Sequence, residues 1–98
     1  PNELLYLCAK SGVEGATRSF ARWGARHKIT VNAIAPHVIT AGMGGHTLSL
    51  DPTILQRIPI GRAGTVKELA NLTLFLSSRC CEYMTGQVLH LNGGRLMQ

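Results

Sequence analysis

Several kinds of residue are scarce in this 98-residue sequence, and each scarcity excludes a class of protein. Only three cysteines are present, none in C-x-x-C spacing, which argues against a disulfide framework and favours free thiols in a reducing compartment. The four histidines lack the i, i+4 pairing of a helical metal site, so we expect no metal. No apolar run approaches the roughly 20 residues that span a bilayer, and no signal peptide is evident. The sequence therefore predicts a cytoplasmic protein with no membrane partner.

Acidic residues are also few, five against ten basic ones, and the formal net charge is +5. Such a balance could indicate an anionic partner, a nucleic acid or a nucleotide phosphate. Arg18, Arg22 and Arg26 are four apart, so they share one face of a helix. No zinc-finger or helix-turn-helix pattern occurs. We therefore interpret this stripe as a solvated helix face and expect no nucleic-acid partner.

A helical pattern covers residues 4–26, where Tyr6, Lys10, Val13, Thr17 and Phe20 recur at spacings of three and four. Interior glycines at positions 12 and 15 each cost roughly 1 kcal/mol relative to alanine. We expect another helix to approach closely there and offset that cost.

The rest of the chain predicts strands and helices in alternation. Residues 29–35 form an apolar strand that Pro36 ends, and residues 36–50 form a loop. Asp51 and Pro52 then begin a short helix that runs to about residue 57.

A capping box of Thr65 and Glu68 begins the next helix, which runs to about residue 77. Its expected inward residues are Val66, Leu69, Leu72, Thr73 and Leu76. A turn at Thr85–Gly86 precedes a last strand over residues 87–91.

The fold class is therefore α/β with a parallel sheet. Two strands do not make a stable sheet alone, so the remainder of the sheet must be supplied by another segment or chain.

Tyr6 and Lys10 carry the most distinctive chemistry. They are four apart and share a helix face. A phenol has a pKa near 10, and a neighbouring ammonium lowers it, so the pair could exchange a proton with a substrate oxygen. On these two residues alone, a surface tyrosine beside a surface lysine is the favoured explanation of the spacing.

The surrounding sequence resembles the short-chain dehydrogenase/reductase family, and its motifs are most similar to those of the 3-oxoacyl-[acyl-carrier-protein] reductase-like branch. The resemblance runs from Tyr6 to the end of the chain, in matching order and spacing. Its blocks are Tyr6–Val13, Val31–Pro36, Ile58–Gly64, Glu68–Asn71 with Leu74–Leu76, and Thr85–Val88 with Asn92–Gly94.

The resemblance implies a Rossmann-like doubly wound sheet, of which residues 1–98 are the C-terminal fragment of a single domain. It also implies an NAD(P)-dependent oxidoreductase that interconverts a carbonyl and an alcohol. Tyr6 would be the proton donor or acceptor, and Lys10 would lower its pKa and bond the cofactor ribose. Pro36 and Ile39 would line the nicotinamide pocket, and residues 40–55 would form a substrate lid.

The sequence departs from the family pattern at several positions. His37 replaces a glycine, Asn92 replaces an aspartate, and Trp23 falls where an acidic residue is usual. The threonine beside the nicotinamide falls in register at Ala41, so a one-residue slip would bring Thr40 into that role.

The family's serine, catalytic asparagine and glycine-rich phosphate-binding turn all belong upstream of residue 1. We therefore expect this chain alone to bind NADP or NAD weakly or not at all. The alternative is a non-catalytic truncated remnant or an oligomerisation module. The family also implies a small-molecule substrate and a homo-oligomer, dimer or tetramer, in the full-length form.

Overall fold

A computed structural model describes residues 2–40 and 52–97, which form two compact units. One unit contains Pro1–Ala33 with Ser78–Leu89, and the other contains Ile34–Ser77 with His90–Gln98. The predicted loop after Thr40, including Ala41, and the predicted cap Asp51 lie outside the described residues. The elements in chain order are α1 (Asn2–Ala25), β1 (Ala33–Pro36), β2 (Ile39–Thr40), α2 (Pro52–Gln56), β3 (Gly64–Thr65), α3 (Val66–Leu76), the 3-10 helix η1 (Arg79–Cys81) and β4 (Val88–Leu91).

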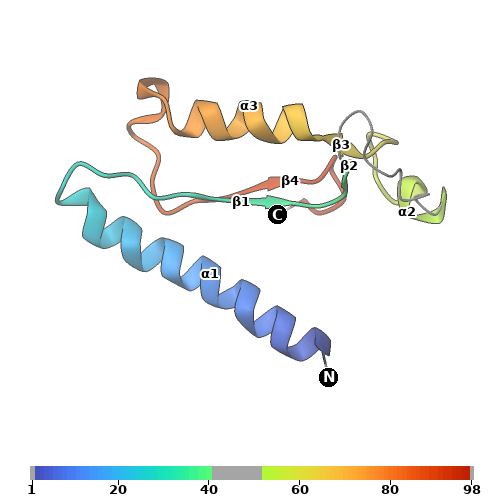
Figure 1. Ribbon diagram of the computed structural model, residues 1–98, viewed down its shortest axis with the longest axis horizontal. Coiled ribbons are helices and arrows are strands. Elements are labelled where there is room, and N and C mark those ends of the chain that lie inside the picture. Colours follow the sequence, from blue (N-terminus) through green and yellow to red (C-terminus); the bar gives the residue numbers. More distant parts are fainter. Residues whose placement is uncertain (1, 41–51, 98) are drawn as a thin grey trace. The chain divides into compact units, whose positions relative to one another are not determined.

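Helix α1 is one uninterrupted helix (Figure 1), which confirms the prediction for residues 4–26 within two residues at the start and one at the end. Thr17, Ala21 and Gly24 are buried along one stripe of its C-terminal half. Val13 and Phe20, which belong to the same helical spacing pattern, are 55% and 60% exposed. At 100° per residue, Tyr6 and Lys10 lie on the same face as this buried stripe.

The C-terminal end of α1 is closed by a Schellman motif. The Ile29 N–H donates to the Gly24 carbonyl at 2.9 Å, and the Lys28 N–H donates to the Ala25 carbonyl at 3.2 Å. Lys28 has a φ of 59°, the left-handed conformation that usually selects glycine at this position. The reversal places Ile29 so close that a Cβ on Gly24 would lie 3.0 Å from the Ile29 carbonyl oxygen.

The first strand is shorter than predicted, because β1 begins at Ala33 and not at Ile29. The residues before it are hydrogen-bonded to the turn at 84–87 instead of a strand ladder. Val31 donates its N–H to Thr85 Oγ1 at 3.0 Å, and the Gly86 N–H donates to the Val31 carbonyl at 2.7 Å. Asn32 donates from Nδ2 to the Met84 carbonyl and accepts from the Gln87 N–H at Oδ1, so its side chain links the segment before β1 to this turn.

Strand β1 pairs with β4. The Ala33 N–H donates to the Gln87 carbonyl, and the His37 N–H donates to the Leu91 carbonyl. Both strands advance by four residues between these two bonds, so the pair is parallel, as the alternation of elements predicts.

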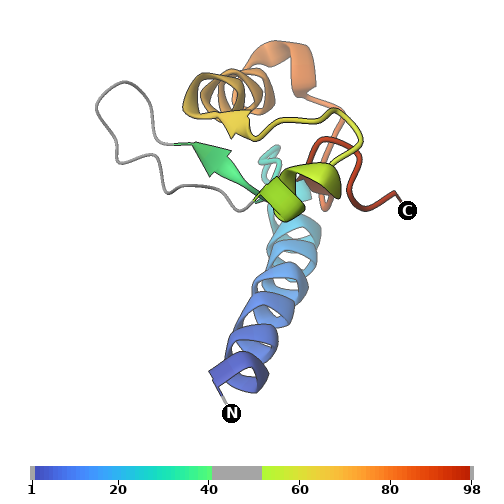
Figure 2. The same ribbon diagram turned by 90° about the vertical axis from the view of Figure 1, so that its right-hand side faces the viewer.

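The second unit contains a parallel β2–β3 pair that the sequence did not predict, with Ile39 opposite Gly64 and Thr40 opposite Thr65. Strand β3 leads directly into α3 (Figure 2). The predicted capping box is present, because Thr65 Oγ1 accepts from the Glu68 N–H and the Glu68 carboxylate accepts from the Thr65 N–H. Leu69, Leu72 and Leu76 are half-buried as expected, whereas Val66 and Thr73 are exposed.

A turn at Asn92–Gly94 follows β4 and packs on residues 58–60. Gly93 has a φ of +62°, and a Cβ there would lie 2.6 Å from Ile58 Cγ2. Ile58 itself is only 4% exposed and forms the centre of this small core. Glycine is therefore required at position 93 both for its backbone conformation and for the close approach of Ile58.

Within the described residues, no helix is long and apolar enough to cross a membrane.

Candidate functional site

Tyr6 and Lys10 lie together on the N-terminal half of α1. The Lys10 Nζ is 5.4 Å from the centroid of the Tyr6 ring, so the predicted pair does form on one helix face. Tyr6 is 61% exposed, and the neighbouring Leu4, Leu5 and Leu7 are exposed to a similar degree. No carboxylate in the described part of the chain lies within 4.0 Å of the Lys10 ammonium. Its three donors are therefore available for hydroxyl groups.

Pro36, Ile39 and Thr40 belong to the other unit, where Pro36 ends β1 and the other two residues follow shortly after it. Ile39 and Thr40 form β2 and are half-buried. The Thr40 hydroxyl donates to the Gly64 carbonyl at 3.2 Å, so its single proton is used within the unit. Thr40 can still accept a hydrogen bond from a ligand, but it cannot donate one without losing this contact.

His37, which takes the place of the family's glycine, makes a contact that sequence analysis missed. Its Nε2 lies 2.9 Å from Arg95 Nη1. The two residues are 58 positions apart, so no spacing or periodicity links them. The only sequence signal was the departure at position 37 itself.

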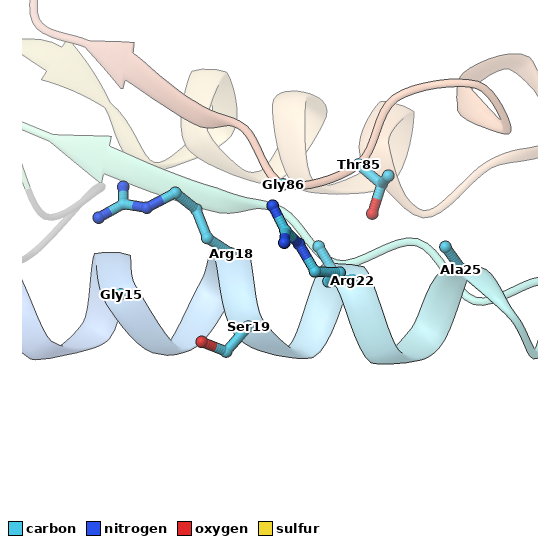
Figure 3. A pocket seen from close by; sticks show the side chains of 8 residues that line it. Gly15, Arg18, Ser19, Arg22, Ala25, Thr85 and Gly86 are labelled. Carbon is cyan, nitrogen blue, oxygen red and sulfur yellow. The ribbon is translucent and has the colours of Figure 1, made fainter.

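Two arginines of the predicted stripe, Arg18 and Arg22, line an open groove of about 750 Å³ within the first unit. Arg22 extends from the helix toward the turn at Gly86, whereas Arg18 extends away from that turn (Figure 3). Glu14 lies 4.0 Å from Arg18, and both side chains are about half exposed or more, at 47% and 62%. These exposures agree with the predicted solvated face.

Arg62 and Glu68 form an exposed ion pair in the second unit. The bond is bidentate, with Arg62 Nη1 2.7 Å from Glu68 Oε1 and Nη2 3.2 Å from Oε2. The hydrogen bond from Arg62, followed by the one from Thr65, lowers the pKa of Glu68 to about 2. This carboxylate stabilises the start of α3, and nothing suggests that it takes part in proton transfer.

The described residues fit one end of a nicotinamide cofactor. Lys10 supplies free donors and Tyr6 a hydroxyl group on one helix face, as contacts to a ribose require. The pyrophosphate end needs a glycine-rich turn at a helix N-terminus, and the sequence contains no G-x-x-x-G-x-G. The chain therefore fits the nicotinamide end alone. No cluster of three or more histidine, cysteine or acidic side chains that could hold a metal occurs among residues 2–40 and 52–97.

Parallel strands joined through helices, with the candidate site residues Pro36, Ile39 and Thr40 near the carboxyl end of β1, are typical of part of a Rossmann-like doubly wound fold. The profile of the family described as enoyl-(acyl carrier protein) reductase matches residues 1–95. The chain belongs to this family, within the short-chain dehydrogenases/reductases.

Two curated relatives are bacterial proteins named 3-oxoacyl-[acyl-carrier-protein] reductase. The one from Buchnera aphidicola is 44% identical over 93 residues, which cover 94% of this chain and 38% of the relative. The one from Staphylococcus aureus is 41% identical over 98 residues, covering 99% of this chain and 40% of the relative. The chain thus spans about two fifths of the length of the curated relatives it matches.

Solved structures agree in fold. A short-chain dehydrogenase from Bacillus anthracis matches 93% of this chain with a TM-score of 0.78 and 38% identity, over 37% of its own length. A mutant of a Serratia marcescens short-chain dehydrogenase/reductase matches 94% of this chain with a TM-score of 0.83 and 30% identity, over 38% of its own length. These matches support the predicted fold class, an incomplete Rossmann-like sheet.

Proposed function

We propose that this chain is the C-terminal part of an NAD(P)-dependent oxidoreductase that interconverts a carbonyl and an alcohol. The observation that carries the proposal is the placement of Tyr6 and Lys10 on one face of α1, 5.4 Å from ring centroid to ammonium. The family membership and the reductase names of the relatives support it.

Tyr6 is the proton donor in the reductive direction. Its hydroxyl donates to the carbonyl oxygen of the substrate and transfers its proton as the alcohol forms. The ammonium of Lys10 places positive charge beside the phenolate that remains, and a Coulomb attraction at this range stabilises it. In the oxidative direction the phenolate accepts the hydroxyl proton of the alcohol.

A reduced nicotinamide, when bound, supplies the hydride that goes to the carbonyl carbon. Lys10 would hold its ribose through the free ammonium donors, and Pro36 and Ile39 would border its nicotinamide ring. Thr40 would contribute only as a hydrogen-bond acceptor, because its proton is donated to Gly64.

The face of α1 that bears Tyr6 and Lys10 is too exposed near these residues for efficient proton transfer, so we expect activity to need further segments that cover it. The same face is buried in the C-terminal half of the helix, whereas around Tyr6 it is exposed. An exposed phenol is solvated by water, and general acid catalysis works best where water is excluded. We expect no measurable turnover by the 98-residue chain alone.

The test is Tyr6→Phe in the full-length protein that contains this chain. We expect reduction of a 3-oxoacyl thioester to fall by about 10²-fold to 10⁴-fold, the usual contribution of a positioned proton donor. Cofactor affinity, measured by quenching of tryptophan fluorescence, should change little. Tyr83→Phe is the matched control, because Tyr83 is fully exposed and belongs to the turn after η1. Undiminished turnover in Tyr6→Phe would overturn the assignment.

The second candidate function is an association module, favoured by the apolar surface of α1. Large apolar side chains at positions 4, 5, 7, 20 and 23 of the helix are each at least 60% exposed. Leu4, Leu5 and Leu7 are gathered in the first two turns of α1, and exposed apolar side chains gathered in this way favour a protein interface. Sedimentation velocity of the chain over a hundredfold range of concentration tests it, and a monomer throughout that range would exclude it.

A further inference from the structure

Two charged or polar side chains meet beyond the carboxyl ends of β1 and β4. His37 directly follows the last residue of β1, and Arg95 lies four residues past the end of β4. Both side chains are exposed, and Arg95 Nη1 is 2.9 Å from His37 Nε2. In open α/β sheets, ligands bind outside the carboxyl ends of the strands. The pair therefore stands where this class of fold places its ligands.

The hydrogen bond leaves most of the guanidinium free. Arg95 donates one N–H to a neutral imidazole, and four of its five N–H groups remain. The edge formed by Nε and Nη2 is not used by His37, and this edge matches the two oxygens of a carboxylate. In the described part of the chain, no carboxylate lies within 4.0 Å of this guanidinium.

Fastening the C-terminal segment does not require this contact. Asn92 already closes the segment, because its Nδ2 donates to the Leu96 carbonyl and its Oδ1 accepts from the Gly94 N–H, both at 3.0 Å. The backbone N–H of Arg95 also donates to the Asn92 carbonyl at 3.2 Å. The turn is held by backbone and amide groups, so the guanidinium of Arg95 is available for another role.

We propose that Arg95, positioned by His37, binds a carboxylate of the substrate and so selects oxo acids over neutral ketones. This inference rests on the proposed oxidoreductase function, because it assigns the substrate class of the same site. Pro36 and Ile39, the proposed nicotinamide neighbours, lie one residue before and two residues after His37 in the sequence. Arg95 is thus a specificity-determining residue and His37 a positioning residue.

The experiment uses the full-length protein and methyl ketones that carry a terminal carboxylate, at three chain lengths. Each acid is paired with its methyl ester, which has the same carbonyl and no charge. We expect a lower KM for one of the acids than for its ester in the unmodified protein. Arg95→Met should raise the KM of that acid roughly tenfold to a hundredfold, the range for loss of a hydrogen bond to a charged group. The KM of the ester and both kcat values should change by less than about threefold.

Three further variants separate charge, position and fold. Arg95→Lys retains the charge without the planar edge and should recover only part of the acid preference. His37→Gly removes the hydrogen-bond partner of Arg95, and we expect a severalfold smaller rise in KM for the acid than in Arg95→Met. Arg79→Met is the matched control, because Arg79 is exposed on η1 in the other unit. It should leave acid and ester unchanged.

A binding measurement keeps this inference distinct from the proposed function. Ligand-observed NMR with the acids and esters reports binding without turnover. Acid-selective binding that Arg95→Met removes, in a protein that reduces nothing, would support the carboxylate site and refute the oxidoreductase. Reduction of acids and esters alike, equally affected or unaffected by Arg95→Met, would refute the carboxylate site alone. Absence of both binding and reduction would refute both.

Discussion

The two halves of α1 differ in what surrounds them, although they form one helix. The C-terminal half buries Thr17, Ala21 and Gly24, and a Schellman motif closes it onto Ile29. The N-terminal half carries Tyr6 and Lys10 among exposed leucines. Contacts among the described residues therefore stabilise the C-terminal half of α1, which lacks the candidate catalytic residues. Among the described residues, the helix that carries Tyr6 is anchored at its C-terminal end, while the Tyr6 side chain is 61% exposed.

A larger side chain in each half should expose this difference most strongly. In the 98-residue chain, Ala21→Leu should lower the free energy of unfolding by about 1–3 kcal/mol, the usual cost of overpacking. Ala21 is 4% exposed, and a Cβ on Gly86 would already lie 3.4 Å from its own Cβ. Ala9→Leu, at an exposed position, should change it by less than about 0.5 kcal/mol. Urea unfolding followed by circular dichroism measures both, and equal effects would show that the halves do not differ.

Glycine substitutions should change stability in opposite directions in the two halves. A Cβ on Gly12 or Gly15 meets nothing within 4 Å in the described structure, so the close helix expected there is not part of this chain's described residues. Gly12→Ala should raise the free energy of unfolding of the chain by about 1 kcal/mol. Gly24→Ala should lower it, because the new Cβ lies 3.0 Å from a carbonyl oxygen. In the full-length protein, loss of the gain in Gly12→Ala would show that another helix packs at this position.

The ion pairs Arg62–Glu68, at the start of α3, and Glu14–Arg18, on α1, should differ in how they affect stability at acid pH. We expect this to be the smallest of the three effects on stability. The pKa of Glu68 is depressed from 4.5 to about 2 in the folded state. Its ionised form therefore contributes stability that is complete above about pH 4.5 and is lost as the pH falls toward 2. Glu68→Gln should flatten this acid limb of the stability profile. Glu14→Gln, which removes the 4.0 Å contact with Arg18, should leave the limb unchanged. An unaltered limb in Glu68→Gln would contradict the assignment.

The parts of the fold that the sequence predicted are those set by near neighbours. Helix α1 and the capping box of α3 follow from spacings of three and four residues. The Schellman motif was missed because Lys28, and not glycine, adopts the left-handed conformation. The β2–β3 pair was missed because two-residue strands have no periodicity to detect.

The candidate site divides in the same way. Tyr6 and Lys10 are four residues apart, and their proximity could be predicted from helix geometry alone. His37 and Arg95 meet only because β1 and β4 are adjacent and the Asn92–Gly94 turn returns the chain to their ends. The roles of Pro36, Ile39 and Thr40 came from family resemblance and stay predictions.

Because α1 is anchored at Gly24, the number of residues before Gly24 determines the direction in which each earlier side chain points around the helix axis. About five helical turns separate Gly24 from Tyr6, so the tyrosine emerges almost directly above the anchored glycine. Deleting one residue between them would rotate Tyr6 and Lys10 together by about 100° and shift them by about 1.5 Å along the axis. Residues 11–23 therefore act as a spacer whose length is constrained independently of its composition. In homologous chains, substitutions in this spacer should be tolerated far better than insertions or deletions.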